Sequence, residues 1–209
     1  QFLDAAKKSG LSGVVDRIRH GYEDQPPSGG RRWLVHYPVT VTWQDCTLAR
    51  RVYKKTLIEL PTWNILAPSN GTTHPSGKPY VRCTGSFSTI VTYSVAEREA
   101  LIELARSFDR MPHKAPKYNV VLASNRPGDV YNQSTTWPEI LEPASWTRVY
   151  NQGVVTYWRR PGKTAGVSAT TNFGASDLLW VFSSSTDFES DRSYDKFGAY
   201  AVLRHDGDF

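Results

Sequence analysis

The sequence predicts a mixed α+β fold, and three observations support that prediction. Apolar residues at helical spacing follow Ser94-Val95-Ala96-Glu97, which has the Ser-x-x-Glu pattern of a helix N-terminal capping box. β-Branched residues alternate with polar ones along residues 33–42, as in a half-buried strand. Two strand-like runs, residues 146–151 and 154–159, flank Gln152-Gly153 and predict a β-hairpin. Helices and short strands therefore share the chain.

The first part of the chain is predicted to mix helices and strands. Two short helices are expected at its start, one ending at Ser9-Gly10 and one over residues 12–22 with Ser12 as N-cap. The helix that follows Ser94 is expected to end before Pro112. Strands are expected over four apolar or β-branched runs: Trp33–Thr42, Thr56–Leu60, Trp63–Leu66 and Phe87–Thr92.

A change of composition divides the chain. Residues 114–134 are rich in Pro, Lys, Asn, Ser and Gly, which predicts a linker. Residues 1–113 then form the C-terminal portion of one domain, and residues 135–209 form a smaller α+β module. Within that module we expect a helix at Trp137–Leu141 with Thr136 as N-cap, the hairpin, a buried strand at 178–183 and a last helix at 195–205. The chain lacks an initiator Met and both ends look helical, so we expect it to be cut from a longer polypeptide.

Composition excludes several classes of protein. Apolar runs are too short for a membrane span. Two cysteines exclude a disulfide scaffold and a four-cysteine zinc site, and the five histidines have no paired metal spacing. P-loop, Gly-x-Ser-x-Gly and His-Glu-x-x-His motifs are absent. The start has no apolar signal-peptide core, so we expect a cytoplasmic location. The net charge of +5, from 25 Lys+Arg against 20 Asp+Glu, is compatible with nucleic-acid binding but does not require it.

Two polar segments of the first part have the chemistry of an anion site. Residues 26–33 form a small-residue turn whose backbone N–H groups are suited to an anion, with arginines beside them. Residues 67–80 gather hydroxyls, His74 and Lys78 in a glycine-containing loop, an inventory suited to phosphate or sugar. The alternative is that both are ordinary polar loops.

Two further candidates lie on predicted strands. Glu59 is an acid in the otherwise apolar run 57–60, where it either pairs structurally or holds a metal; one carboxylate cannot by itself make a magnesium site. Residues 156–163 interleave aromatics with cations, as in a ribbon that stacks the bases of a single strand. The alternative for this hairpin end is a solvated tip with Trp158 packed inward.

Taken together, these segments resemble bifunctional DNA primase–polymerases of the archaeo-eukaryotic type carried by phages, prophages and plasmids. The similarity in the first part lies in PSGGRRWL, LIEL, ILAPSNGTTHPSGKPY and AEREALIELARSFDRMP. The later segments WPEILEPASWTRVY, TYWRRPGKTAGVSATTNFG, LLWVFSSST and YDKFGAYAVLRHDGDF are similar to the region that follows the catalytic domain in phage-type members. The resemblance covers nearly the whole chain, and HPSGKPY and WRRPGK are its most specific parts.

The resemblance implies a mixed sheet with flanking helices, of which this chain holds an incomplete part. It implies template-dependent nucleotidyl transfer for primer synthesis or extension, with Mg or Mn ions on acidic residues. Implied partners are a single-stranded DNA template, nucleoside triphosphates and a downstream helicase domain or subunit, with no membrane.

The candidate site residues fall into three groups, two of which are implied by the resemblance. Glu59 matches the later metal-binding acid and is the implied catalytic residue. The pattern of aromatics and cations in the hairpin itself gives the candidate nucleic-acid-binding residues Trp158, Arg159, Arg160 and Lys163. The implied nucleotide-binding residues are Ser28, Gly29, Gly30, Arg32, Ser69, His74, Ser76 and Lys78.

The sequence departs from the family pattern at three places. The early acidic pair is absent, Arg32 occupies the position of the motif histidine, and Leu60-Pro61-Thr62-Trp63 replaces a glycine-rich turn. His36 cannot substitute, because four residues along a strand separate it from position 32 by about 13 Å. Arg32 could still bind a triphosphate as a fixed cation. We therefore expect a primase–polymerase segment that is inactive alone; the alternative is a non-catalytic nucleic-acid-binding or docking module of a replication protein.

Overall fold

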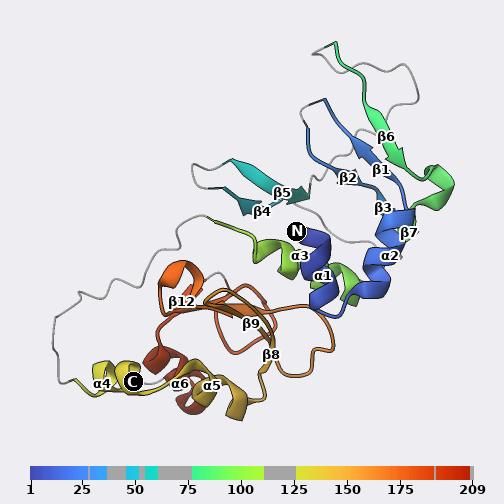
Figure 1. The fold of residues 1–209 in the computed structure, drawn as a ribbon. Coiled ribbons are helices and arrows are strands. Elements are labelled where there is room, and N and C mark those ends of the chain that lie inside the picture. Colours follow the sequence, from blue (N-terminus) through green and yellow to red (C-terminus); the bar gives the residue numbers. More distant parts are fainter. Residues whose placement is uncertain are drawn as a thin grey trace.

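The computed structural model describes residues 1–27, 29–36, 46–51, 55–60, 77–110, 126–190 and 192–207. It confirms the mixed α+β class. A five-stranded sheet forms the middle layer, with α1–α3 on one face and α4–α6 on the other (Figure 1). The α-helices are α1 (Phe2–Lys8), α2 (Ser12–His20), α3 (Val95–Arg106), α4 (Pro127–Ser134), α5 (Trp137–Leu141) and α6 (Lys196–His205). Short 3₁₀ turns are η1 (Phe87–Thr89), η2 (Glu142–Ala144) and η3 (Phe173–Ala175).

The five-stranded sheet is an antiparallel meander in the order β12-β11-β10-β9-β8. Its strands are β8 (Thr147–Gln152), β9 (Val155–Arg159), β10 (Ala169–Thr171), β11 (Leu179–Val181) and β12 (Arg192–Tyr194). The predicted hairpin is present as β8 and β9, with Gln152 paired to Val155 across a turn in which Gly153 has a φ of 60°. Glycine adopts that left-handed conformation without steric cost.

Alternate residues of this sheet fill two separate cores. Tyr157 and Phe182 face α1–α3, together with Val167 from the connection before β10. Trp158 and Leu179 belong to the other core, beneath α5 and α6. Adjacent strand residues point to opposite faces, so a sheet covered on both sides has strands that are apolar throughout. This explains why residues 178–183, the predicted buried strand that contains β11, are almost all apolar.

The first part of the chain carries three small sheets among the described residues. A three-stranded antiparallel sheet has the order β2-β1-β6, β3 pairs in parallel with β7, and β4 pairs with β5. These strands are β1 (Glu23–Gln25), β2 (Arg32–Trp33), β3 (Val35–His36), β4 (Cys46–Arg50), β5 (Thr56–Leu60), β6 (Val81–Thr84) and β7 (Val91–Thr92). The primase–polymerase-type sheet expected for residues 1–113 stays a prediction.

The predicted division into two units stays a prediction, and one core contains residues from both of them. The core on one face of the five-stranded sheet is built jointly by α1–α3 and by β9 residues. Part of the predicted linker is helical, because α4 begins with Pro127 at its first turn, where proline is favoured, and its Tyr131 packs on Tyr200 of α6. The linker residues 114–125 lie outside the described residues.

Local capping signals located several helix starts. Ser94 accepts a hydrogen bond from Glu97 N at 3.2 Å, and the Glu97 carboxylate accepts one from Ser94 N at 3.0 Å, which confirms the predicted capping box of α3. Thr136 and Glu139 form a second capping box at α5. Two details differ: Leu11 rather than Ser12 is the N-cap of α2, and the run 87–92 begins with the turn η1 instead of a strand.

None of the described helices is long and apolar enough to cross a membrane.

Candidate nucleic-acid interface

One face of the three-stranded sheet carries a row of charged side chains. Asp24 on β1 lies opposite Arg32 on β2 and opposite Arg82 on β6. Directly opposed residues of antiparallel strands share a face, so these three residues lie side by side across the sheet. Tyr80, just before β6, places its ring 5.5 Å from the Arg32 guanidinium carbon. We call Asp24, Arg32, Arg82 and Tyr80 the arginine row.

The acid at the centre of the arginine row is already committed to one partner. Arg32 donates to both Asp24 oxygens, from Nε at 2.8 Å and from a terminal nitrogen at 2.7 Å, and the Asp24 side chain is 1% exposed. The hydrogen bond to Asp24 is the main cause that raises the pKa of Arg32. Burial, and then the charge of Asp24, raise the pKa of the adjacent Tyr22. Such a bidentate pair is a fixed element of structure rather than a mobile contact.

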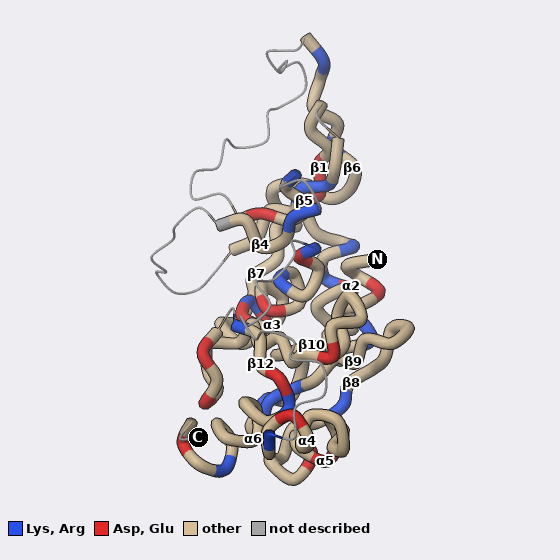
Figure 2. Tube along the Cα trace, turned by 90° about the vertical axis from the view of Figure 1, so that its left-hand side faces the viewer, with Lys and Arg blue, Asp and Glu red and all other residues tan. Residues whose placement is uncertain are grey.

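Two further cations lie near the Asp24–Arg32 ion pair. Arg82 and Lys78 are exposed and have no ion-pair partner within the part of the chain that the structure describes. Both lie at or just before β6, and Val81 at the start of β6 is opposite Gln25 at the end of β1. Figure 2 shows Lys and Arg segments at the end of the molecule that holds β1 and β6. The net charge of the row itself is positive, since one carboxylate faces two guanidinium groups.

The opposite face of the same sheet anchors it to the helices. Glu23 accepts a hydrogen bond from Trp33 Nε1 at 2.6 Å and forms an ion pair with Arg31. The Trp33 ring stacks on Phe2 of α1, with ring centroids 6.2 Å apart. One face of the sheet is therefore used for packing, and the arginine row occupies the other.

The predicted glycine turn lies at the same end of the sheet as Lys78. Gly29 and Gly30 connect β1 to β2 with φ values of 85° and 87°, which favour glycine, and Gly29 N donates to the Pro26 carbonyl at 2.9 Å. Because β6 runs antiparallel to β1, the residues before Val81 lie near this turn. The other predicted nucleotide-binding residues lie outside the described residues: Ser28, Ser69, His74 and Ser76.

Glu59 lies on a different sheet from the arginine row. It is exposed on β5, opposite Thr47 in the two-stranded β4–β5 sheet. His36, the rejected substitute for a motif histidine, lies on β3, which pairs with β7 and not with β1 or β6.

The described acids do not fit the two-metal site that the resemblance implies. Asp24 and Glu23 are each bound to an arginine, and as neighbours on one strand they point to opposite faces. Among the described residues no group of three or more His, Cys, Asp or Glu side chains is placed to hold a metal ion. We derive no catalytic step through magnesium or manganese.

The structure gives the aromatics of the predicted nucleic-acid hairpin a structural role. Trp158 is 1% exposed, lies in the core beneath α5 and α6, and donates from Nε1 to Thr171 Oγ1 at 3.0 Å. Tyr157 is buried in the other core and stacks on Tyr150 with centroids 4.3 Å apart. Adjacent residues of β9 point to opposite faces of the sheet, and both faces are covered. Neither ring is open to a nucleic-acid base in this conformation.

Two of the three predicted cations of the hairpin are also engaged within the chain. Arg159 donates to the carbonyls of Gly166 and Ser9, both at 2.9 Å, and burial lowers its pKa. Lys163 forms an ion pair with Glu103 of α3, and burial lowers the pKa of Lys163 against the opposing charge of Glu103. Arg159 and Lys163 thus join the hairpin to α1 and α3. Arg160 differs, because it lines a pocket.

Sequence reasoning missed two members of the arginine row, Asp24 and Arg82, whereas Tyr80 ends the predicted polar segment 67–80. Asp24 and Arg82 gave no signal, because β1 has only three residues and one of its two partner strands, β6, lies far later in the sequence. The available hint was the pair Glu23-Asp24 eight residues before Arg31-Arg32, a spacing compatible with a short hairpin that pairs opposite charges.

No family model, no curated protein and no solved structure matches this chain.

Proposed function

We propose that this chain is a single-stranded-DNA-binding segment of a replicative primase–polymerase. The observation that carries the proposal is the arginine row, in which one buried carboxylate lies between two arginines beside a tyrosine ring. The resemblance of the sequence to phage-type primase–polymerases supports the replicative context. In this proposal the chain binds the template and does not transfer nucleotides by itself.

The arginine row has the two chemical components that single-strand binding requires. Exposed cations neutralise backbone phosphates and release counterions, which supplies most of the affinity. An aromatic ring beside them gives a stacking face that accepts any base. Arg82 and Lys78 supply the cations, and Tyr80 supplies the ring. Arg32 serves a different purpose, since its guanidinium is held by Asp24 and in turn supports the Tyr80 ring.

The proposal assigns the chemistry of nucleotide transfer to other segments of the whole protein. Each described acid on β1 is bound by an arginine, so neither offers a free carboxylate to a metal ion. Nucleoside triphosphates, the divalent metal ions and a downstream helicase are therefore proposed partners of the whole protein. The non-catalytic binding module, which was the alternative from the sequence, describes this chain itself.

Replacing Arg82 and Lys78 with glutamine is expected to weaken binding to a single-stranded oligonucleotide and to reduce its salt dependence. Each lost phosphate contact flattens the log–log slope of affinity against salt by about 0.7. Fluorescence anisotropy across a salt series measures both quantities. Lys8→Gln with Arg19→Gln is the matched control, because it removes one exposed lysine charge from α1 and one exposed arginine charge from α2, both outside the arginine row.

Retention of the wild-type slope by the double variant would exclude these two cations from the interface. A loss of affinity of the same size in the Lys8→Gln, Arg19→Gln control would show that the effect follows total charge rather than the arginine row.

A further inference from the structure

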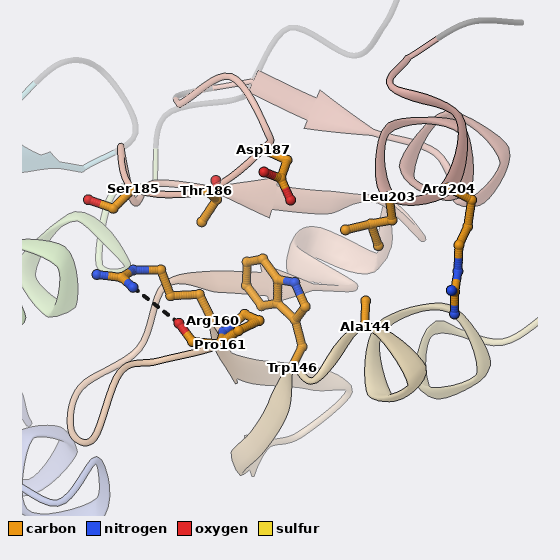
Figure 3. Close-up of a pocket in the computed structure, with 9 residues that line it drawn as sticks. All are labelled: Ala144, Trp146, Arg160, Pro161, Ser185, Thr186, Asp187, Leu203 and Arg204. Atoms are coloured by element: carbon orange, nitrogen blue, oxygen red, sulfur yellow. Dashed lines mark hydrogen bonds between the residues drawn. The ribbon is translucent and has the colours of Figure 1, made fainter.

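A pocket of about 390 Å³ lies on the α6 side of the five-stranded sheet, far along the chain from the arginine row. Two arginines line it, Arg160 just after β9 and Arg204 near the end of α6, together with the hydroxyls of Ser185 and Thr186. Figure 3 shows the arginines at opposite ends, with Trp146 and Asp187 between them. Its volume is within the range of small-molecule sites.

Arg160 has hydrogen-bonding capacity that the described structure does not use. One terminal nitrogen donates to the adjacent Pro161 carbonyl at 3.1 Å, while the buried Nε–H has no hydrogen-bond partner among the described residues. A buried guanidinium N–H without an acceptor costs free energy, and an anion in the pocket would remove that cost. Arg160 is therefore the cation best placed to bind a ligand here, in contrast to Arg159 and Lys163.

The middle of the pocket requires a different chemistry from its ends. Trp146 is 4% exposed and is fixed by an edge-on contact with Phe188, with centroids 5.9 Å apart, so it forms a rigid aromatic wall. The exposed carboxylate of Asp187 lies above it and disfavours a purely anionic ligand (Figure 3). Asp187 instead accepts hydrogen bonds, which suits N–H or O–H groups on the ligand.

We propose that this pocket binds a nucleotide, with its phosphate on Arg160 and its base or sugar donors facing Asp187. A phosphate matches the planar donor fork of arginine, and an uncharged ring with donor groups matches the aromatic wall and the carboxylate. Inorganic phosphate would meet Arg160 but gain nothing from Trp146 or Asp187. The choice of a nucleotide rests on the proposed function, because the same protein would handle nucleotides and single strands.

The test uses the whole chain and three probes: deoxycytidine 5′-monophosphate, deoxycytidine and inorganic phosphate. Isothermal titration calorimetry is expected to show the monophosphate binding more tightly than either part alone. Arg160→Gln is expected to weaken monophosphate binding by about tenfold or more, because it removes a charged hydrogen-bond donor. Asp187→Asn is expected to reduce the difference in binding affinity between the monophosphate and inorganic phosphate.

Arg19→Gln is the charge-matched control, and circular dichroism checks that each variant folds. Arg160→Gln removes only one described internal hydrogen bond, so it is expected to fold. Equal monophosphate affinity in Arg160→Gln and Arg19→Gln would overturn the proposal. So would equal affinity for monophosphate and inorganic phosphate, or no binding of monophosphate by the wild type.

Competition distinguishes the two sources of the nucleotide. If an oligonucleotide with a 5′-phosphate displaces the monophosphate and its unphosphorylated form does not, the pocket holds the end of a strand. If neither displaces it, the pocket holds a free nucleotide; both results support the proposal. The chain could also bind an oligonucleotide through Arg82 and yet not bind the monophosphate. That result would overturn the proposal for the pocket but would still support the proposed function.

Discussion

Replacing Lys163 with methionine is expected to lower the free energy of unfolding by about 3–5 kcal/mol, because it leaves the charge of Glu103 buried without a partner. The side chains of Lys163 and Glu103 are only 11% and 12% exposed. Their ion pair joins the loop after β9 to α3, across one of the two cores. Chemical denaturation followed by circular dichroism measures the change.

A paired variant separates the ion pair from the packing around it. Burial lowers the pKa of Lys163 despite the nearby Glu103, so desolvation of the lysine opposes much of the attraction between the charges. Replacing both residues, as in Lys163→Met with Glu103→Leu, is therefore expected to restore most of the lost stability. Arg148→Gln, which breaks the exposed Arg148–Glu142 pair, is expected to cost about 1 kcal/mol or less. If Lys163→Met also lowered the free energy of unfolding by only about 1 kcal/mol or less, the buried Lys163–Glu103 ion pair would be contradicted.

Replacing Trp158 with alanine is expected to lower the free energy of unfolding by about 3–5 kcal/mol, the usual cost of removing a buried aromatic side chain. Trp158 is 1% exposed in the core formed with α5 and α6. Trp158→Phe keeps most of the apolar volume and loses the hydrogen bond to Thr171, so about 1–2 kcal/mol is expected. The same denaturation experiment ranks the two variants.

The conservative variant also separates the structural role of Trp158 from a base-stacking role. Because the ring is buried, Trp158→Phe is expected to leave oligonucleotide affinity unchanged while it lowers stability. A variant with wild-type stability and reduced oligonucleotide affinity would instead restore the stacking role that the sequence suggested.

Features set by neighbouring residues were predictable from the sequence, and features set by distant partners were not. The capping boxes of α3 and α5 and the β8–β9 hairpin depend on residues a few positions apart, and all three are present. Strand β1 has three residues and is stabilised by β6, which begins more than fifty positions later. A strand that short has no periodicity for a sequence pattern to reveal. Helix α4 was hidden by its Pro-Gly-Asp start, which resembles a linker.

The candidate site shows the same division. The sequence identified segments rich in cations but could not assign a partner to each cation. Arg32 is held by Asp24 eight residues away, and Lys163 by Glu103 sixty residues away, so both became structural. Arg82 drew no attention because its neighbours in the sequence are unremarkable, yet the sheet places it across Asp24 from Arg32. The sequence shows which residues are charged and could bind a ligand. The tertiary fold determines which of these cations are paired with acids of the chain and which are available to a ligand.

Photocrosslinking of the chain to a single-stranded oligonucleotide carrying 5-iodouracil tests the central claim most directly. Mass spectrometry of the crosslinked peptides locates the residue that lies against a base. We predict a crosslink at Tyr80, within the peptide that includes Lys78 and Arg82, and its loss in the Lys78→Gln, Arg82→Gln variant. Crosslinks confined to other peptides, with none at Tyr80, would contradict the assignment of the arginine row as the nucleic-acid interface.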